Sequence, residues 1–223
     1  MRYIIANWKS NKLLKDCLDW VSEAGPKIQK REGVEVVICP TMTSLSEVQK
    51  AVQTENFAFS LGAQNVSPFG FGSYTGEEAA EMLKQYVSYS IVGHSERRKY
   101  FAESDEMIGE KITRLKEVGV IPVLCVQDEH TPIPADVSIV AYEPVFAIGT
   151  GNADTPENAN NTASRIKEAH PGIEILYGGS VTSENAKAFL EQQSISGLLI
   201  GKASLDASEF AKIVEIAQSL SQT

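Results

Sequence analysis

The sequence has 223 residues, of which 43% are hydrophobic and 22% are charged, and this ordinary balance excludes disorder as a description of the whole chain. The formal net charge is −9 and no run of more than three basic residues occurs, which argues against nucleic acid or an anionic membrane surface as a partner. No stretch is apolar for the length of a bilayer, and the first residues carry too short an apolar run for a signal peptide. The sequence therefore predicts a cytoplasmic protein.

Short apolar runs rich in β-branched residues alternate with amphipathic stretches along the chain. Most runs are apolar on successive residues, which is typical of parallel strands buried on both faces. The expected strands are Tyr3–Ala6, Val34–Cys39, Phe57–Gln64, Ser90–Val92, Ile121–Val126, Ser138–Tyr142, Ile173–Tyr177 and Gly197–Ile200. The expected helices are Asp16–Arg31, Ser44–Gln53, Glu77–Tyr86, Ser104–Val118, Pro156–His170, Glu184–Gln193 and Leu205–Ser219.

This repeat predicts a (β/α)8 barrel that occupies residues 1–223 as a single domain, since no linker-like segment divides the chain. The competing architecture is an open, doubly wound sheet. Such a sheet often has a glycine-rich first turn, whereas the turn Asn7–Lys12 contains no glycine.

One connection departs from the repeat. The segment Gln127–Val137 is too short for a crossover with its own helix, and it contains Pro132 and Pro134, which oppose helix formation. We expect a bare loop between the fifth and sixth strands and seven outer helices. We also expect the outer face of these two strands to be left uncovered, unless a partner chain or rearranged neighbours cover it.

Polar residues and glycines follow the ends of five predicted strands, where the catalytic groups of such barrels gather. A carboxylate, an imidazole and an ammonium would meet there, together with small-residue loops whose N–H groups suit a phosphate. Lys12, a few residues beyond Lys9, is expected to be solvated. The residues that follow these five strands are Asn7 and Lys9, then Gly93–Arg98, Glu143–Gly151, Gly178–Val181 and Gly201–Ser204.

Five motifs in this order resemble triosephosphate isomerases from the first strand to the last helix. They are Asn7-x-Lys9, Gly93–Arg98, Ala141–Val145, Ala147–Gly151 and Tyr177–Val181. The resemblance implies interconversion of dihydroxyacetone phosphate and glyceraldehyde 3-phosphate. It implies no metal and no organic cofactor.

By the same resemblance, Glu143 is the base that moves a proton between adjacent carbons. His94 acts as a neutral imidazole that polarises the carbonyl oxygen and shuttles protons. Lys9 stabilises the developing negative charge, and Asn7 and Glu96 orient these groups.

The resemblance also implies a lid and a phosphate grip. The lid consists of Pro144, Val145, Phe146, Ala147, Ile148, Gly149, Thr150 and Gly151, with a second hinge at Asn152–Asp154. Lid closure would exclude water and bring the Gly149 N–H to the phosphate. Ser180 and the N–H groups of Gly201 and Lys202 would complete the grip.

The segment Asn65–Gly76 resembles the loop by which two subunits of this family interdigitate. A homodimer is therefore implied, with a tetramer as the larger alternative. The expected contact residues are Tyr74, Thr75, Glu77 and Arg97, with Glu77 pairing with Arg97.

Four positions depart from the family pattern besides the short fifth connection. Phe146 replaces a tryptophan, and Gln127-Asp128 replaces a glycine-glutamate pair. Because Phe146 has no hydrogen-bond donor, we expect the open-lid contact of the family to be absent and the lid equilibrium to be altered. Lys202 replaces a glycine, and its ammonium would add attraction for phosphate.

Two alternatives stay open at this point. One is another phosphate-binding barrel enzyme, and the other is a non-catalytic barrel that serves as a scaffold or interaction protein. The presence of Lys9, His94 and Glu143 opposes the scaffold.

Overall fold

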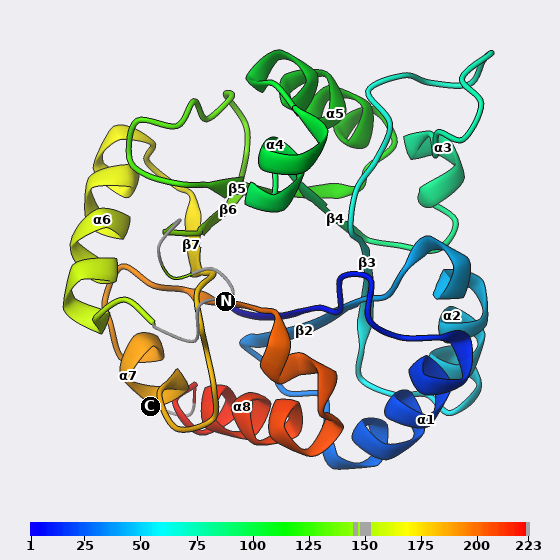
Figure 1. The fold of residues 1–223 in the computed structure, drawn as a ribbon. Helices are drawn as coiled ribbons and strands as arrows, with labels where there is room; N and C mark the ends of the chain where they lie inside the picture. Colours follow the sequence, from blue (N-terminus) through cyan, green and yellow to red (C-terminus); the bar gives the residue numbers. More distant parts are fainter. Residues whose placement is uncertain (145–146, 148–152, 222–223) are drawn as a thin grey trace.

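In the computed structural model, eight parallel strands form a closed barrel in chain order, with β8 paired to β1 (Figure 1). The structure describes residues 1–144, 147 and 153–221. The predicted barrel is confirmed, and the open sheet is excluded. The strands are β1 (Arg2–Asn7), β2 (Val34–Cys39), β3 (Ser60–Ala63), β4 (Tyr89–Val92), β5 (Ile121–Val126), β6 (Ile139–Tyr142), β7 (Glu174–Tyr177) and β8 (Gly197–Ile200).

The apolar runs of the strands contribute side chains to two hydrophobic layers. Alternate residues such as Ile5, Val37 and Val123 point into the barrel and pack on one another. Their neighbours, such as Ile4 and Ile38, pack outward against the helices. Both faces of each strand are thus removed from water, which explains why the runs are continuous rather than alternating.

Helices surround the barrel in every connection but one (Figure 1). They are α1 (Leu14–Ala24), α2 (Leu45–Thr54), α3 (Ala80–Leu83), α4 (Ser95–Phe101), α5 (Asp105–Glu117), α6 (Pro156–Ala169), α7 (Ala186–Leu190) and α8 (Ala207–Ser219). Short 3-10 turns, η1 (Gly25–Lys27), η2 (Met42–Ser44) and η4 (Lys202–Leu205), precede β2, α2 and α8.

Three predicted helices are much shorter in the structure, and the one predicted at Glu184–Gln193 covers only Ala186–Leu190. The first ends at Ala24 rather than Arg31, because Gly25 and Pro26 are poor helix residues and the chain continues as η1. The third covers only Ala80–Leu83 rather than Glu77–Tyr86.

An eighth helix, α4, was not predicted. It lies with α5 in the connection between β4 and β5, so six connections between strands carry seven helices and α8 follows β8. Its sequence is mostly polar and has no apolar periodicity to reveal it. Ala102 ends it in the left-handed region at φ 51°.

The connection between β5 and β6 contains no helix, as predicted. Ion pairs tie this loop to both neighbouring helices, Asp136 to Lys116 of α5 (3.0 Å) and Glu129 to Arg165 of α6 (2.8 Å). The expectation that the outer face of β5 and β6 is left uncovered is wrong, since Leu124 and Val140 are fully buried in the outer layer. The loop and its two neighbouring helices cover these strands without a partner chain (Figure 1).

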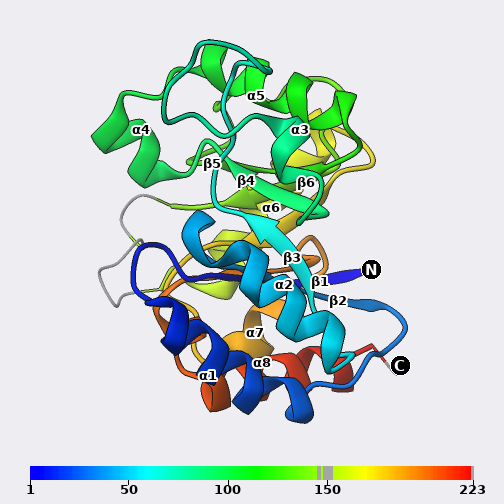
Figure 2. The ribbon, with the colours of Figure 1, turned by 90° about the vertical axis from the view of Figure 1, so that its right-hand side faces the viewer.

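Figure 2 shows the barrel from the side, with α4 projecting at one end and both termini at the other. The connections that follow the strands at the α4 end bear the polar motifs. None of the helices in the described ranges is both long and apolar enough to cross a membrane.

A buried ion cluster joins α4 to α5. Glu103 is 1% exposed and accepts hydrogen bonds from Lys111 and, at 2.9 Å, from Arg97. Lys111 also donates to Asn65 at 2.7 Å, at the start of the β3–α3 connection. Burial works to raise the pKa of Glu103, but Lys111 and Arg97 outweigh it and hold the pKa below its ordinary value.

Glu103→Gln is expected to destabilise the fold by about 3–5 kcal/mol, because it leaves the charge of Lys111 buried without its partner. Because the folded-state pKa of Glu103 is lowered, its stabilisation is present above the ordinary carboxyl pKa and is lost as pH falls through the folded-state value. Urea unfolding at pH 7 and at pH 3–4 measures both effects. Exposed Glu106→Gln on α5 is the matched control. Equal free energies of unfolding for the two variants at pH 7 would contradict this account.

Candidate active site

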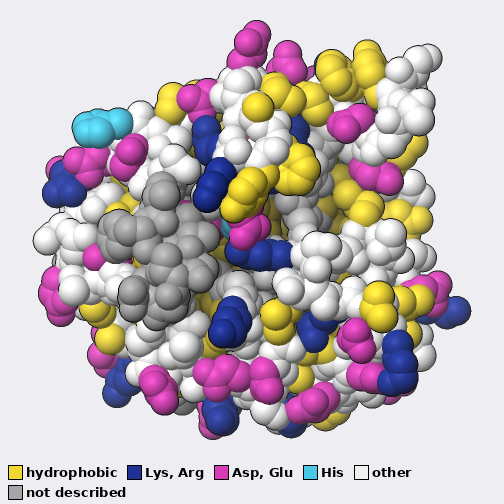
Figure 3. Space-filling model, viewed as in Figure 1, with side chains coloured by type: hydrophobic (Ala, Val, Ile, Leu, Met, Phe, Trp, Pro, Cys, Tyr) yellow, Lys and Arg dark blue, Asp and Glu magenta, His cyan; other side chains and the backbone are white. Residues whose placement is uncertain are grey.

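A cavity of about 1020 Å³ opens where the carboxyl ends of the strands meet. Five connections contribute to its lining, and in the face of Figure 3 acidic and basic side chains meet near the centre of the barrel. The described lining includes Asn7, Lys9, His94, Glu143, Gly179, Ser180, Gly201 and Lys202. The structure thus brings together the candidate residues from β1, β4, β6, β7 and β8.

The end of β1 directs Asn7 and Lys9 into this cavity. Trp8 between them is fully buried on the other side and meets Trp20 of α1 edge to face at 4.8 Å. Lys9 has a φ of 50°, a conformation that costs a residue with a side chain about 1–2 kcal/mol. The Lys9 N–H donates to Asn7 Oδ1 (3.1 Å), and the Gln64 amide donates to the Lys9 carbonyl (2.9 Å).

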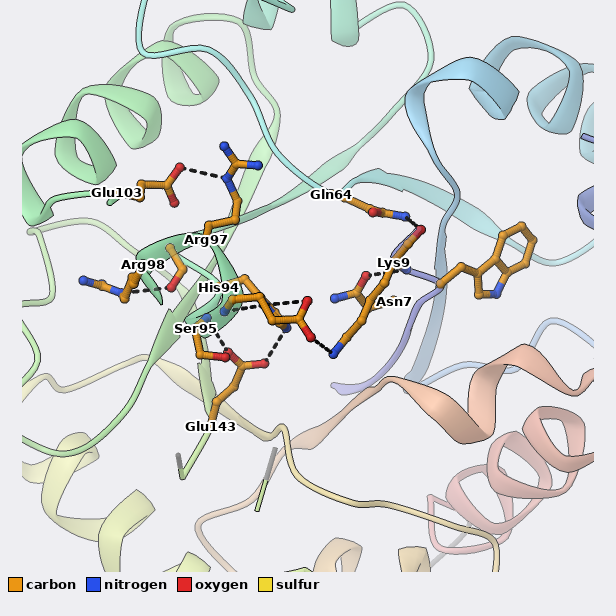
Figure 4. Close-up of polar contacts among 12 residues, drawn as sticks. Asn7, Lys9, Gln64, His94, Ser95, Arg97, Arg98, Glu103 and Glu143 are labelled. Carbon is orange, nitrogen blue, oxygen red and sulfur yellow. Dashed lines mark hydrogen bonds and ion pairs between the residues drawn. The ribbon is translucent and has the colours of Figure 1, made fainter. Parts of the chain in front are cut away.

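The Lys9 ammonium binds Glu96 Oε1 at 2.5 Å (Figure 4). Glu96 comes from the first turn of α4, the helix that follows β4. Asn7 holds the Lys9 backbone and Glu96 holds its ammonium. Both contacts are of the kind expected for residues that orient Lys9.

His94 follows β4 and begins α4. Its Nδ1 accepts a hydrogen bond from the Glu96 N–H at 3.2 Å. A neutral imidazole in this position must carry its proton on Nε2, because the lone pair of Nδ1 is occupied. Nε2 lies 3.1 Å from Glu143 Oε1, so the proton faces the cavity and its carboxylate.

Glu143 directly follows β6 and is 3% exposed. Its N–H donates to the Val126 carbonyl (2.8 Å), and its Oε2 accepts from the Ser95 N–H (3.3 Å). A Cβ on residue 178 would lie 2.8 Å from the Glu143 side chain, so Gly178 makes room for the carboxylate.

Opposing effects set the ionisation of Glu143. Burial works to raise its pKa. The attraction of His94 and hydrogen bonds from His94, the Ser95 N–H and the Cys125 thiol outweigh burial, so the pKa of Glu143 lies below its ordinary value. Burial, followed by the charge of Glu143, raises the pKa of Cys125 well above the usual thiol value. Cys125 therefore stays a thiol, and Glu143 is ionised at neutral pH.

Ser180 does not point its hydroxyl at an open phosphate site in this structure. Its Oγ donates to the Ala147 carbonyl at 2.9 Å. Ala147 is fully buried, and its N–H donates to the Pro144 carbonyl (2.8 Å). The remaining predicted lid residues, Val145, Phe146, Ile148, Gly149, Thr150 and Gly151, lie outside the described residues.

Tyr177 was not predicted as part of the site. Its hydroxyl accepts a hydrogen bond from the Asp154 N–H at 2.8 Å, at the end of the predicted second hinge. Its ring stacks on Phe189 with centroids 4.0 Å apart. A Cβ on residue 179 would collide with this hydroxyl, at 2.1 Å, so Gly179 is required for the contact. The tyrosine immediately before two glycines is the signal that could have found it.

Asp128 is engaged within its own loop. Its Oδ1 accepts from the N–H groups of His130 (2.9 Å) and Thr131 (2.8 Å) and from the Thr131 hydroxyl (3.0 Å). This is the geometry of a side-chain-capped turn. The Asp128 carboxylate is thus engaged within its own loop. The expected loss of its contact with the lid stays a prediction, because Phe146 lies outside the described residues.

The dimer residues can be placed only within one chain. Arg97 donates to Glu103 and lies over the Phe101 ring at 5.0 Å. It forms no ion pair with Glu77 within the described chain. The pairing of Arg97 with Glu77 stays a prediction.

A closed parallel barrel with a carboxylate, an imidazole and an ammonium around one cavity defines the class of barrel enzymes that catalyse proton transfer. The family model of triosephosphate isomerase matches residues 2–136 and 133–217, and the chain belongs to this family. The two matches meet in the connection between β5 and β6, where the barrel lacks its helix.

Similar proteins named triosephosphate isomerase occur in several bacteria. The one from Aquifex aeolicus is 39% identical, and the alignment covers 96% of this chain and 98% of the relative. Those from Alkaliphilus oremlandii and Fusobacterium nucleatum are 38% and 37% identical, with 95% and 96% of this chain and 97% and 98% of the relatives covered. The similarity therefore extends over nearly the whole barrel.

Gly178→Ala is expected to push Glu143 away from the Ser95 N–H and from His94, and so to raise the pKa of Glu143. A crystal structure of the variant and a carboxyl 13C NMR titration would measure both changes. The control is Gly109→Ala on α5, where an added Cβ meets nothing within 4 Å. An unmoved carboxylate in Gly178→Ala would show that this glycine is not what seats Glu143.

Proposed function

We propose that this protein is an active triosephosphate isomerase that interconverts dihydroxyacetone phosphate and D-glyceraldehyde 3-phosphate. The observation that carries the proposal is the ionised Glu143 carboxylate 3.1 Å from His94 Nε2, at a cavity that also receives the Lys9 ammonium. The reaction needs a base at carbon, a donor at oxygen and a fixed positive charge, and these three groups supply them.

In this mechanism Glu143 removes a proton from the carbon next to the carbonyl, and an enediolate forms. The Nε2–H of His94 polarises the carbonyl oxygen and then moves protons between the two oxygens. Lys9 stabilises the negative charge. Glu143 returns its proton to the neighbouring carbon, so the step is redox-neutral and its atoms balance.

Substrate must first free the carboxylate. Glu143 is held by the Ser95 N–H and faces His94 Nε2, which is also the donor that the substrate oxygen would use. The substrate oxygen therefore replaces Glu143 Oε1 on His94, and the carboxylate turns toward the substrate carbon.

The phosphate group would lie at the ends of β7 and β8. The N–H groups of Gly149, Gly201 and Lys202 would bind it, with Ser180 as a further contributor. Lys202 lines the cavity and carries no ion pair within 4 Å in the described chain, so its ammonium is available to the phosphate dianion. A site of this kind makes a net charge of −9 compatible with an anionic substrate.

Glu143→Gln is expected to lower kcat for triose phosphates by about 10²–10⁴-fold, the usual contribution of a positioned base. A coupled isomerase assay on purified protein measures this loss. The matched control is Glu184→Gln at the rim of the same cavity, which should retain most of the turnover. An inactive wild-type protein that is well folded would instead favour a non-catalytic barrel.

We also propose that the protein forms a homodimer through the β3–α3 connection and α4. Phe69 and Tyr74 stack at 4.3 Å while both are exposed, and Phe71, Tyr100 and Phe101 are about two-thirds exposed. Apolar side chains gather at the upper right of Figure 3, over these elements. A patch of this kind on a single chain is typical of a surface that a partner covers. Tyr74, Thr75, Glu77 and Arg97 would belong to this interface, and a tetramer would need a further surface.

Phe71→Asp combined with Tyr74→Asp is expected to convert the dimer to a monomer, because two charges would be buried in an apolar contact. Light scattering coupled to size exclusion measures the mass. Thr113→Asp on the exposed face of α5 should leave the assembly unchanged. A wild-type chain that runs at its monomer mass of 24.3 kDa would refute the dimer.

A cytoplasmic location is part of the proposal. The three cysteines are all free and buried, which fits a reducing compartment.

A further inference from the structure

Lys12 is not the solvated side chain that its sequence position suggested. Its ammonium donates a hydrogen bond to the Leu205 carbonyl at 2.8 Å, across 193 positions of sequence. The same nitrogen lies 5.5 Å from the centre of the Trp8 ring. Lys12 is therefore held between the buried indole that follows β1 and the connection that follows β8.

Leu205 is the last residue of η4, and η4 begins where the proposed phosphate-binding N–H groups lie. An internal hydrogen bond stabilises the first turn of η4, since the buried Ser204 hydroxyl donates to the Gly201 carbonyl at 2.7 Å. A four-residue turn has too few hydrogen bonds of its own to fix its direction. The contact with Lys12 supplies an external anchor at its far end.

The connections after β1 and β8 also meet at the other end of η4. A Cβ on Gly201 would lie 3.6 Å from Lys9 Cε, so the Gly201 backbone already lies against the Lys9 side chain. Gly201, Lys202 and Leu205 all line the cavity, whereas Lys12 does not. Lys12 thus holds the backbone at this end of the cavity without lining the cavity itself.

We propose that Lys12 is a positioning residue for phosphate binding. By fixing the Leu205 carbonyl it holds η4 so that the N–H groups of Gly201 and Lys202 face the phosphate. This inference rests on the proposed function, because it concerns the phosphate end of the same cavity. It assigns to Lys12 no part in proton transfer, which belongs to groups at the ends of β1, β4 and β6.

A substrate without a phosphate distinguishes an effect on phosphate binding from an effect on proton transfer. Glyceraldehyde offers the same carbonyl and the same proton but does not use η4. Lys12→Met keeps the apolar stem and removes the donor. We expect the variant to raise KM for glyceraldehyde 3-phosphate and Kd for inorganic phosphate by about tenfold, the effect of losing one charge-assisted hydrogen bond. The loss of kcat/KM should be at least fivefold larger for the phosphorylated substrate than for glyceraldehyde.

Controls distinguish positioning from charge and from general damage. Lys12→Arg keeps a charged donor beside Trp8 and should restore most of the phosphate affinity. Lys15→Met removes one charge from exposed α1, where Lys15 pairs only with Asp19 among the described residues, and should leave both constants unchanged. The Lys12→Met effect should persist in 0.5 M salt, because a local contact is screened little.

Phosphate binding can be followed without turnover by 15N NMR of the Gly201 and Lys202 amides in the full-length protein. Weaker phosphate-induced shifts in Lys12→Met than in wild type would support the inference even if the isomerase assay failed. Equal losses for both substrates, an effect that disappears in salt, or unchanged phosphate affinity would each overturn it. A wild-type protein whose two amides do not respond to phosphate would overturn it as well.

Discussion

The site depends on one contact, in which Glu143 Oε1 lies 3.1 Å from His94 Nε2. These residues follow β6 and β4, which both pair with β5, so β5 between them sets their separation. The register pairs Val92 at the end of β4 with Leu124, and Tyr142 at the end of β6 with Val126, two residues further along β5. The start of α4 then adds the Glu96 N–H that leaves the imidazole proton on Nε2. A closed barrel supplies this geometry because neighbouring parallel strands end at the same face.

The missing fifth helix leaves this arrangement intact. The β5–β6 loop lies on the outside of the barrel, tied to α5 and α6 by ion pairs, while the reacting groups lie inside its rim. β5 contributes the Cys125 thiol near the carboxylate and the Val126 carbonyl that accepts the Glu143 N–H. A connection that carries no reacting side chain can be shortened, provided that the outer apolar face stays covered, as full burial of Leu124 and Val140 shows. This separation of scaffold from site is a general property of the fold.

Much of this could be read from the sequence, because strands buried on both faces leave continuous apolar runs. The residues directly after those runs gave the candidate site, and two prolines in a short connection gave the missing helix. The contacts that some residues make across the barrel left no local signal of their partners. Gln64 holds the Lys9 backbone from β3, Tyr177 holds Asp154, and Lys12 holds Leu205. Each pair is distant in sequence, so its contact exists only once the barrel has closed.

The most direct test of the central claim is a 15N NMR measurement of the His94 imidazole in the free protein at pH 8. The account predicts that the proton of the neutral ring is on Nε2, because Nδ1 accepts from the Glu96 N–H. The preference of the ring proton for Nε2 over Nδ1 should be lost when the Glu96 N–H is removed by Glu96→Pro. A proton found on Nδ1, or an imidazolium at this pH, would contradict the account, because His94 could then not serve as a neutral donor facing Glu143.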